Sequence, residues 1–408
     1  MTSAISSERR PDLDWIRVAA FFLLILYHVG MFYVPWDFHV KSPHPVEWLE
    51  PVMMLTNPWR LTLLFLVSGA ATRFMADKVS AGGLAKARTA RLLPPLVFAV
   101  LVIVPPQSFY EVIERFGFTG SFAQFYGKYL TASGHWCDAA GCLITPTYNH
   151  MWFVAYLLIY SLILAGLLRF AGPAFAKAQA GLERGLGGWG LLLWPTLFLM
   201  FLRLTLYPRF EITHALVDDW YNHALSFGVF LFGFLTAKSA SMKAGFIRLR
   251  WRALIVAVLG YGVYASVRWI YRAEDASIPL TIQALAQVAY GLNQWGAIAA
   301  ILGFGAKHLT RGGPVLTYLT LGVFPFYIIH QTFIVVAGYH LAKLGLPQGL
   351  EAMILIVGTF VCCFATYEIV RRVALLRPLF GLQPATSLQN GDMRGVRPEI
   401  APGPAPGQ

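Results

Sequence analysis

The amino-acid sequence predicts an all-α protein that crosses a membrane many times. Of its 408 residues, 57% are hydrophobic and only 13% are charged. Soluble proteins carry about 25% charged residues, and a soluble fold of this composition would expose large apolar patches to water. Long apolar runs recur along the chain, and none shows the alternation with a period of two that marks a barrel strand. These runs are therefore expected to be transmembrane helices.

We count about ten apolar runs, most of them close to the length needed to cross a hydrocarbon core of about 30 Å. They lie approximately at residues 15–35, 51–75, 92–111, 150–171, 189–207, 220–237, 252–272, 285–306, 315–338 and 350–370. Their sequences show no internal repeat, so the inverted-repeat pattern common among secondary transporters lacks support here.

Lysine and arginine residues are distributed unequally between the connecting segments. If the N-terminus is cytoplasmic, the cytoplasmic segments hold 22 of these residues and the external segments hold seven. Positive residues accumulate on the cytoplasmic side, so both termini are predicted to be cytoplasmic. The same rule accounts for the net charge of +12, which we do not interpret as nucleic-acid binding. The first run is too long for a cleavable signal peptide, and no small-residue cleavage site follows it.

The predicted organisation is one membrane domain between two tails. The membrane domain covers residues 11–382, after a short N-terminal tail of residues 1–10. Residues 383–408 are rich in proline, glycine and polar residues, so a disordered C-terminal tail is expected. The longest external segment, near residues 112–149, is aromatic and polar.

Cys137 and Cys142 lie in this external segment. On the oxidising side of the membrane they would form a small disulfide loop, and two free thiols are the alternative. No Cys/His quartet at zinc spacing accompanies them, so no metal site is expected.

The first apolar run carries Arg17 in its first turn and His28 eleven residues further on. Eleven residues are close to three helical turns, so both side chains share one helix face, separated by about 16 Å along the axis. An ionisable residue at membrane depth is costly and by default suggests function. The alternative is that His28 only donates a hydrogen bond to a neighbouring helix.

Arg88 and Arg91 precede the third run and lie three residues apart, so they project from one helix face at the cytoplasmic mouth. Paired guanidinium groups suit the binding of phosphates, although ordinary positive-inside arginines are the alternative. Arg17 lies at the same level. The three arginines are therefore candidates for holding a phosphorylated carrier, with His28 deeper in the membrane.

Four further residues are weaker candidates for contact with a substrate. Arg60 lies near the outer end of the second run, where snorkelling to the interface explains it equally well. His150 and Trp152 open the fourth run at the outer surface, where tryptophan is also an ordinary interfacial anchor. His330 lies nearly as deep in the ninth run as His28 in the first. The two histidines either flank one cavity or serve as separate hydrogen-bonding groups.

These residues occur in a set of motifs that resembles the membrane acyltransferase type 3 superfamily. The motifs are DWIR (14–17), His28 after ten intervening residues, LLFLVSG (63–69), the R-x-x-R of Arg88 and Arg91, HMWF (150–153) and PFYIIHQ (325–331). The resemblance runs from about Pro11 to about Leu382. Within the superfamily, the chain looks closest to the glucan biosynthesis protein C branch, which is associated with succinylation of periplasmic glucans.

The resemblance implies an enzyme of the bacterial inner membrane, an acyltransferase for groups other than aminoacyl groups. It implies acyl-CoA as the donor of an acetyl or succinyl group, held at Arg17, Arg88 and Arg91, and no permanently bound cofactor. The implied acceptor is a hydroxyl of a glycan or lipid-linked sugar at the periplasmic side. His28 matches the histidine taken to be catalytic, either as a general base or as the site of an acyl-histidine intermediate.

Two other functions remain open. A proton-coupled transporter would use His28 and His330 as a proton relay, and it predicts proton flux without dependence on CoA. A scaffolding membrane protein would use its buried histidines only for hydrogen bonds, and it predicts little loss on His28→Ala.

Overall fold

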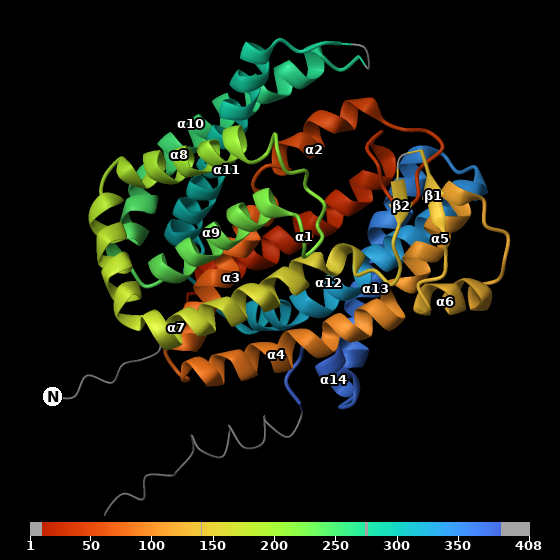
Figure 1. Cartoon of the computed structure of the whole chain (residues 1–408), viewed down its shortest axis with the longest axis horizontal. Coiled ribbons are helices and arrows are strands. Elements are labelled where there is room, and N and C mark those ends of the chain that lie inside the picture. Colours follow the sequence, from red (N-terminus) through yellow and green to blue (C-terminus); the bar gives the residue numbers. More distant parts are fainter. Residues whose placement is uncertain (1–9, 140, 274–275, 385–408) are drawn as a thin grey trace, which may run out of the picture.

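A computed structural model describes residues 10–139, 141–273 and 276–384 (Figure 1). Most of both predicted tails, 1–10 and 383–408, lies outside these residues. The elements in chain order are α1 (Pro11–Tyr33), η1 (Glu47–Leu49), α2 (Glu50–Thr56), α3 (Arg60–Ala76), α4 (Ala81–Phe98), the π-helical η2 (Ala99–Ile103), α5 (Pro105–Phe116), α6 (Phe122–Leu130), β1 (Trp136–Asp138), β2 (Gly141–Leu143), η3 (Asn149–Met151), α7 (Trp152–Gly185), α8 (Gly190–Thr205), α9 (Trp220–Thr236), α10 (Ala240–Ile270), α11 (Leu280–His308), α12 (Pro314–Leu341), η4 (Ala342–Leu344), α13 (Gln348–Arg372) and α14 (Leu376–Leu379).

Each of the predicted apolar runs coincides with helical structure. Within the described ranges, six helical segments are long and apolar enough to cross a membrane: Pro11–Tyr33, Ala81–Phe116, Asn149–Gly185, Ala240–Ile270, Pro314–Leu344 and Gln348–Arg372. The helical, many-spanning architecture agrees with the sequence analysis. The count of about ten crossings and the cytoplasmic position of both termini remain predictions.

Prolines explain where the helices depart from the expected boundaries. The predicted run 51–75 is broken between α2 and α3, where Pro58 follows the end of α2. The predicted run 150–171 continues as α7 to Gly185, with a kink at Ala171 (φ −128°, ψ 25°) shortly before Pro173. Proline removes a helical hydrogen bond and clashes with the preceding turn. It therefore bends α7, and the predicted connecting segment after residue 171 is helical instead.

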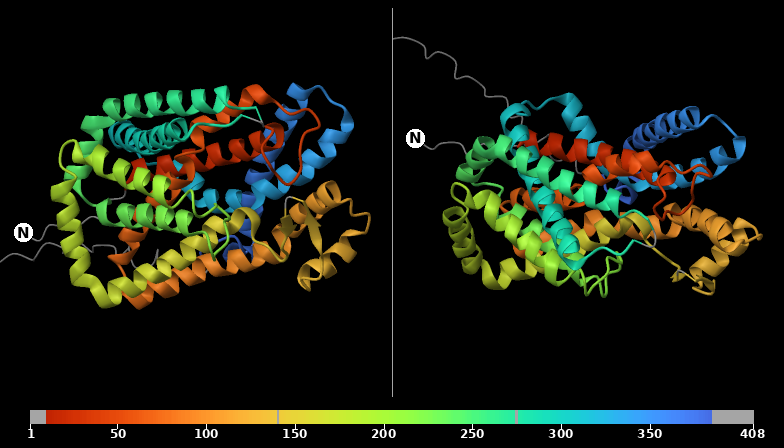
Figure 2. Two further views of the ribbon diagram at one scale, coloured as in Figure 1. Left: turned by 45° about the horizontal axis from the view of Figure 1, so that its top comes forward. Right: turned by 90° about the horizontal axis from the view of Figure 1, so that it is seen from above.

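Helix α1 lies near the middle of the bundle. It packs against α3, α11, α12 and α13, and the views in Figures 1 and 2 show it running between them. The residues of α1 that are buried by these neighbours include Ile16, Leu24, Ile25 and Phe32. The side chains of α1 therefore meet residues from several helices that are distant in sequence.

Lys41 fixes the end of α1 that carries His28. Its ammonium donates hydrogen bonds to the carbonyls of Met31 (2.6 Å), Trp36 (2.8 Å) and Val34. A cation in this position also complements the negative end of the helix dipole. Burial lowers the pKa of Lys41 to about 8, and nearby Asp37 opposes this shift.

Helices α3 and α9 approach so closely that only glycine fits at two positions. A Cβ atom on Gly69 would overlap the carbonyl oxygen of Phe230, and one on Gly233 would overlap the carbonyl oxygen of Leu66. Small residues let helix backbones come together in this way in membranes. The reciprocal contact fixes α3, and thereby Arg60 at its start, relative to α9.

Gly69→Ala is expected to destabilise the folded protein by about 1–3 kcal/mol, because backbone atoms must move to admit the methyl group. Gly166→Ala in α7 is a matched control, because a Cβ there meets nothing within 4 Å. The midpoints of thermal unfolding of the purified variants measure the difference. Equal midpoints for the two variants would contradict the close packing of α3 on α9.

A small cap made of α5, α6 and the β1–β2 hairpin covers one end of the molecule (Figure 1). Val112, Phe125, Tyr129 and Trp136 form its own hydrophobic core. The segment predicted as a long loop is therefore mostly folded. A disulfide joins Cys137 to Cys142, which face each other across the hairpin. From the sequence alone, two free thiols were the alternative to this disulfide.

Candidate active site

His28 on α1 and His330 on α12 are in direct contact. His28 Nδ1 lies 2.8 Å from His330 Nε2, and the ring centroids are 5.0 Å apart with an interplanar angle of 25°. His330 is completely buried, whereas His28 is partly exposed. The two histidines therefore lie together, although only His28 lines a cavity.

The hydrogen bonds indicate which ring nitrogens of His28 and His330 carry a proton. His330 Nδ1 lies 2.7 Å from the carbonyl oxygen of Tyr327, which can only accept, so Nδ1 carries a proton. In a neutral ring His330 Nε2 is then an acceptor, and His28 Nδ1 must donate to it. The other nitrogen of neutral His28, Nε2, keeps its lone pair. The pair is therefore arranged so that His28 Nε2 is the basic atom.

His150 covers another side of His330. The two rings are 5.3 Å apart and perpendicular. His150 Nε2 donates to the carbonyl of Ile328 (3.1 Å), and the hydroxyl of Tyr327 donates to the carbonyl of His150. These bonds hold η3 against α12, so His150 is only 6% exposed. His150 is therefore packed inside the protein; its expected position at the outer membrane surface stays a prediction.

A cavity of about 760 Å³, which we call the outer cavity, lies beside this cluster. Four residues named from the sequence line it: His28, Arg60, His150 and Trp152. The Trp152 ring lies 4.2 Å from that of His214, a loop residue whose pKa is lowered by burial. This volume is typical of sites for small molecules. His330 lies behind His28 and is not part of the lining.

Arg60 is 3% exposed, and its guanidinium carbon lies 3.4 Å from the ring centroid of Tyr27, the residue before His28. The snorkelling explanation for Arg60 is therefore wrong, because its charged end is packed inside the bundle instead of reaching an interface.

Arg17, Arg88 and Arg91 line a second cavity, of about 170 Å³, which we call the inner cavity. Arg17 donates to Asp14 (3.1 Å), and Arg88 donates to the hydroxyl of Thr72. Both Arg88 and Arg91 lie on α4, as their spacing predicts. The structure thus brings together three arginines from two helices that are distant in sequence.

The two cavities are stacked along the same four helices. Each of α1, α3, α7 and α12 contributes residues to both, and on no helix do the two sets overlap, although they are adjacent on α7 at Trp152 and Phe153. On α12, Tyr327 lines the inner cavity and Gln331 the outer one, with His330 between them. The histidine pair therefore lies at the level where one cavity gives way to the other.

A polar network beside the outer cavity was not found from the sequence. His39 Nδ1 lies 2.6 Å from Glu111 Oε2, and His39 Nε2 lies 2.9 Å from the amide nitrogen of Gln331. Gln331 in turn donates to Gln107 (3.2 Å). Glu111, an acid at the end of an apolar run, is the one member whose sequence context offered a signal. The amide side chains carry no such signal.

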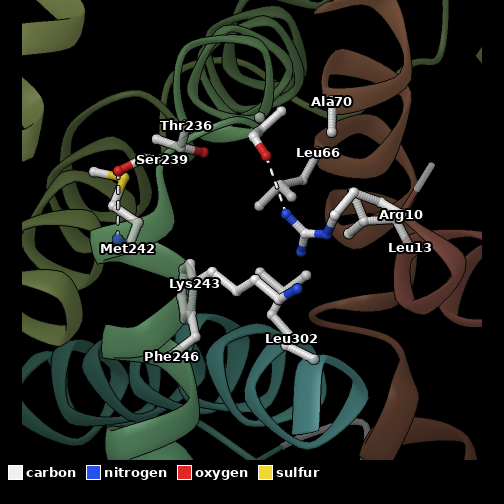
Figure 3. Close-up of a pocket in the computed structure, with 13 residues that line it drawn as sticks. Arg10, Leu13, Leu66, Ala70, Thr236, Ser239, Met242, Lys243, Phe246 and Leu302 are labelled. Atoms are coloured by element: carbon white, nitrogen blue, oxygen red, sulfur yellow. Dashed lines mark hydrogen bonds between the residues drawn. The ribbon is translucent and has the colours of Figure 1, made fainter. Parts of the chain in front are cut away.

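A third and much smaller cavity, of about 40 Å³, includes Arg10 and Lys243 (Figure 3). Arg10 donates to the carbonyl of Ala237 (3.0 Å) and pairs with Asp12 (2.6 Å). Such a volume holds a few water molecules, so it does not compete as a substrate site. Among the described residues, no three His, Cys, Asp or Glu side chains are arranged to hold a metal ion.

His330→Phe is expected to lower the turnover number by about tenfold to hundredfold, because His28 loses the acceptor that orients it. His330→Gln should recover part of the loss, since an amide oxygen can also accept from His28 Nδ1. Acyl-CoA binding should be unchanged in both variants. Equal losses for the two variants would contradict an orienting role for His330.

The fold and the site define a many-spanning membrane protein with a histidine pair between an arginine-lined cavity and a larger polar one. Residues 10–368 match the family described as "Acyltransferase domain". The chain therefore belongs to this family and is a membrane acyltransferase.

The chain is also similar to curated proteins named "Glucans biosynthesis protein C". Those of Shigella dysenteriae serotype 1 and Escherichia coli O81 are each 22% identical over 95% of this chain and 98% of the relative. This similarity agrees with the branch that the sequence motifs indicate. No solved structure matches the chain.

Proposed function

We propose that this enzyme moves a short acyl group, acetyl or succinyl, from cytoplasmic acyl-CoA to a sugar hydroxyl at the periplasmic side of the bacterial inner membrane. The observation that carries the proposal is the stacking of two cavities on either side of the histidine pair. The inner cavity offers three guanidinium groups for the CoA phosphates. The outer cavity offers room for a sugar next to His28.

The proposed chemistry uses the proton arrangement of the pair. His28 Nε2 takes the proton of the acceptor hydroxyl while the oxygen attacks the thioester carbonyl. The tetrahedral intermediate collapses, the carbon–sulfur bond breaks, and the proton passes from His28 to the leaving CoA sulfur. An ester and free CoA result. His330 supports the positive charge that His28 carries between the two steps, because its Nε2 accepts from His28 Nδ1.

The acceptor is proposed from the names of the relatives and from the size of the outer cavity. The relatives are named for glucan biosynthesis, so a periplasmic glucan is the first acceptor to test. With both termini and the inner cavity in the cytoplasm, the pantetheine arm must reach from Arg17 toward His28, about 16 Å along α1.

The test is acyl transfer by the purified protein in nanodiscs, with acetyl-CoA or succinyl-CoA and a soluble glucan. We expect CoA release that depends on the glucan, together with an ester on the glucan detected by mass spectrometry. Proton flux in proteoliposomes without any binding of acyl-CoA would contradict the proposal and favour a transporter.

A further inference from the structure

The outer cavity buries two positive charges that have no acidic partner. Arg60 and Arg203 both line it and are 3% and 7% exposed. Neither forms an ion pair with a carboxylate among the described residues. The other charged residues of the lining, Asp37 and Arg268, are exposed. Uncompensated charge is costly inside a bundle, so a functional reason for these arginines is expected.

Arg60 is the less satisfied of the two arginines. Its Nε and Nη1 atoms are buried without a hydrogen-bond partner in the described structure. The face of its guanidinium rests on the ring of Tyr27, 3.4 Å from the centroid. A cation–π contact stabilises the charge but accepts no N–H bond. Nε and Nη1 of Arg60 therefore remain available to donate charge-assisted hydrogen bonds to an acceptor.

Arg203 is held by neutral groups. Nε donates to Gln287 (2.5 Å) and Nη1 to the hydroxyl of Tyr221 (3.3 Å). The guanidinium carbon lies 3.9 Å and 3.7 Å from the ring centroids of Tyr207 and Tyr290. These contacts fix its position without neutralising it. Arg203 therefore adds to the positive potential of the cavity, and Arg60 offers the open donors.

We propose that the outer cavity binds a carboxylate at Arg60, next to the reacting histidine. This inference rests on the proposed acyl transfer and names the chemistry of the group that enters the cavity. The carboxylate belongs either to a dicarboxylic acyl group or to an acidic sugar of the acceptor. Both sources present the same carboxylate oxygens to the guanidinium of Arg60, and the experiments below separate them.

The first experiment measures carboxylate binding without CoA. The purified protein is titrated with succinate and with glucuronate at constant ionic strength, and the midpoint of thermal unfolding is followed; succinamide and glucose are the neutral controls. We expect at least one acid to raise the midpoint of the wild type more than its neutral analogue does. If neither acid does so, the proposal is overturned.

The variants are Arg60→Gln, Arg60→Lys and, as matched control, Arg209→Gln on an exposed loop outside the cavity. Arg60→Gln should weaken carboxylate binding by about tenfold to hundredfold, the effect of losing charge-assisted hydrogen bonds. Arg60→Lys should be intermediate, and Arg209→Gln should match the wild type. Without ligand, Arg60→Gln should be at least as stable as the wild type, because it removes an uncompensated buried charge. An unchanged carboxylate affinity in Arg60→Gln would overturn the proposal.

The second experiment identifies the source of the carboxylate from kcat/KM. If the acyl group carries it, Arg60→Gln lowers the value for succinyl-CoA about tenfold to hundredfold and leaves acetyl-CoA within about threefold. If the acceptor carries the carboxylate, Arg60→Gln lowers kcat/KM for an acidic acceptor, whichever acyl-CoA is the donor. An equal loss with every donor and acceptor would overturn the assignment.

Carboxylate binding at Arg60 without acyl transfer would contradict the proposed function alone. Acyl transfer that is unaffected by Arg60→Gln would contradict this inference alone.

Discussion

His28→Ala is expected to lower turnover by about 10²–10⁴-fold, the usual contribution of a general base, while acyl-CoA binding stays intact. The expectation follows from the hydrogen bonds around the pair. Tyr327 forces the proton of His330 onto Nδ1, and His330 forces the proton of His28 onto Nδ1. His28 Nε2 is left as the unprotonated atom of a residue that lines the outer cavity.

The measurement is the rate of glucan-dependent CoA release at saturating acyl-CoA, with the dissociation constant of acyl-CoA determined separately. His135→Ala is a suitable control, because His135 is an exposed loop residue outside both cavities. If His28→Ala retained more than about a tenth of the wild-type rate, a general base would be excluded at this position.

Replacing Arg88 and Arg91 together with alanine is expected to weaken acyl-CoA binding by about hundredfold or more, with a smaller effect on the saturated rate. Each lost charge-assisted hydrogen bond to a phosphate accounts for about 1.5–3 kcal/mol. Arg88 is 7% exposed and lines the inner cavity with Arg91. An arginine that served only to orient the protein in the membrane would not need to be buried in this way.

The matched control is the double variant Lys78→Ala, Lys86→Ala. It removes the same charge from the same part of the chain, but both lysines are exposed and lie outside the inner cavity. Binding of acyl-CoA as a function of salt concentration compares the two. If both double variants lose affinity equally, the arginines act only through the general positive potential of that surface, and a phosphate site in the inner cavity is contradicted.

The sequence predicted the parts of this molecule that depend on local pattern. Apolar runs gave the helices, because a bilayer requires about 20 consecutive apolar residues. The eleven-residue spacing of Arg17 and His28 placed both on one face of one helix. Arg88 and Arg91 could be read in the same way, since both lie on one short stretch of α4.

The parts that depend on packing between distant segments could not be read in this way. The contact between His28 and His330 joins residues 302 positions apart. Two residues at equal depth in two helices need not point toward each other, so the contact could not be predicted from their depth. The burial of His150 could not be predicted either, because it depends on hydrogen bonds to Tyr327 and Ile328 of α12. Arg60 was ambiguous for a similar reason, since only the fold shows that its charge rests on Tyr27 and not at an interface.

Arg203 illustrates a signal that was present but not used. It lies within an apolar run, and an arginine at membrane depth is by default a functional hypothesis. Its aromatic surroundings come from three separate segments, at Tyr207, Tyr221 and Tyr290, so its role in the outer cavity appears only when the helices are assembled.

The central claim is that the donor binds at the arginines of the inner cavity, the acceptor enters the outer cavity from the opposite side of the membrane, and the two meet at His28. Sealed proteoliposomes test it most directly, with radiolabelled acyl-CoA added outside and glucan enclosed inside. We predict label on the enclosed glucan with wild-type protein and none above background with His28→Ala. Labelling that requires glucan and acyl-CoA on the same side of the membrane would contradict the split site.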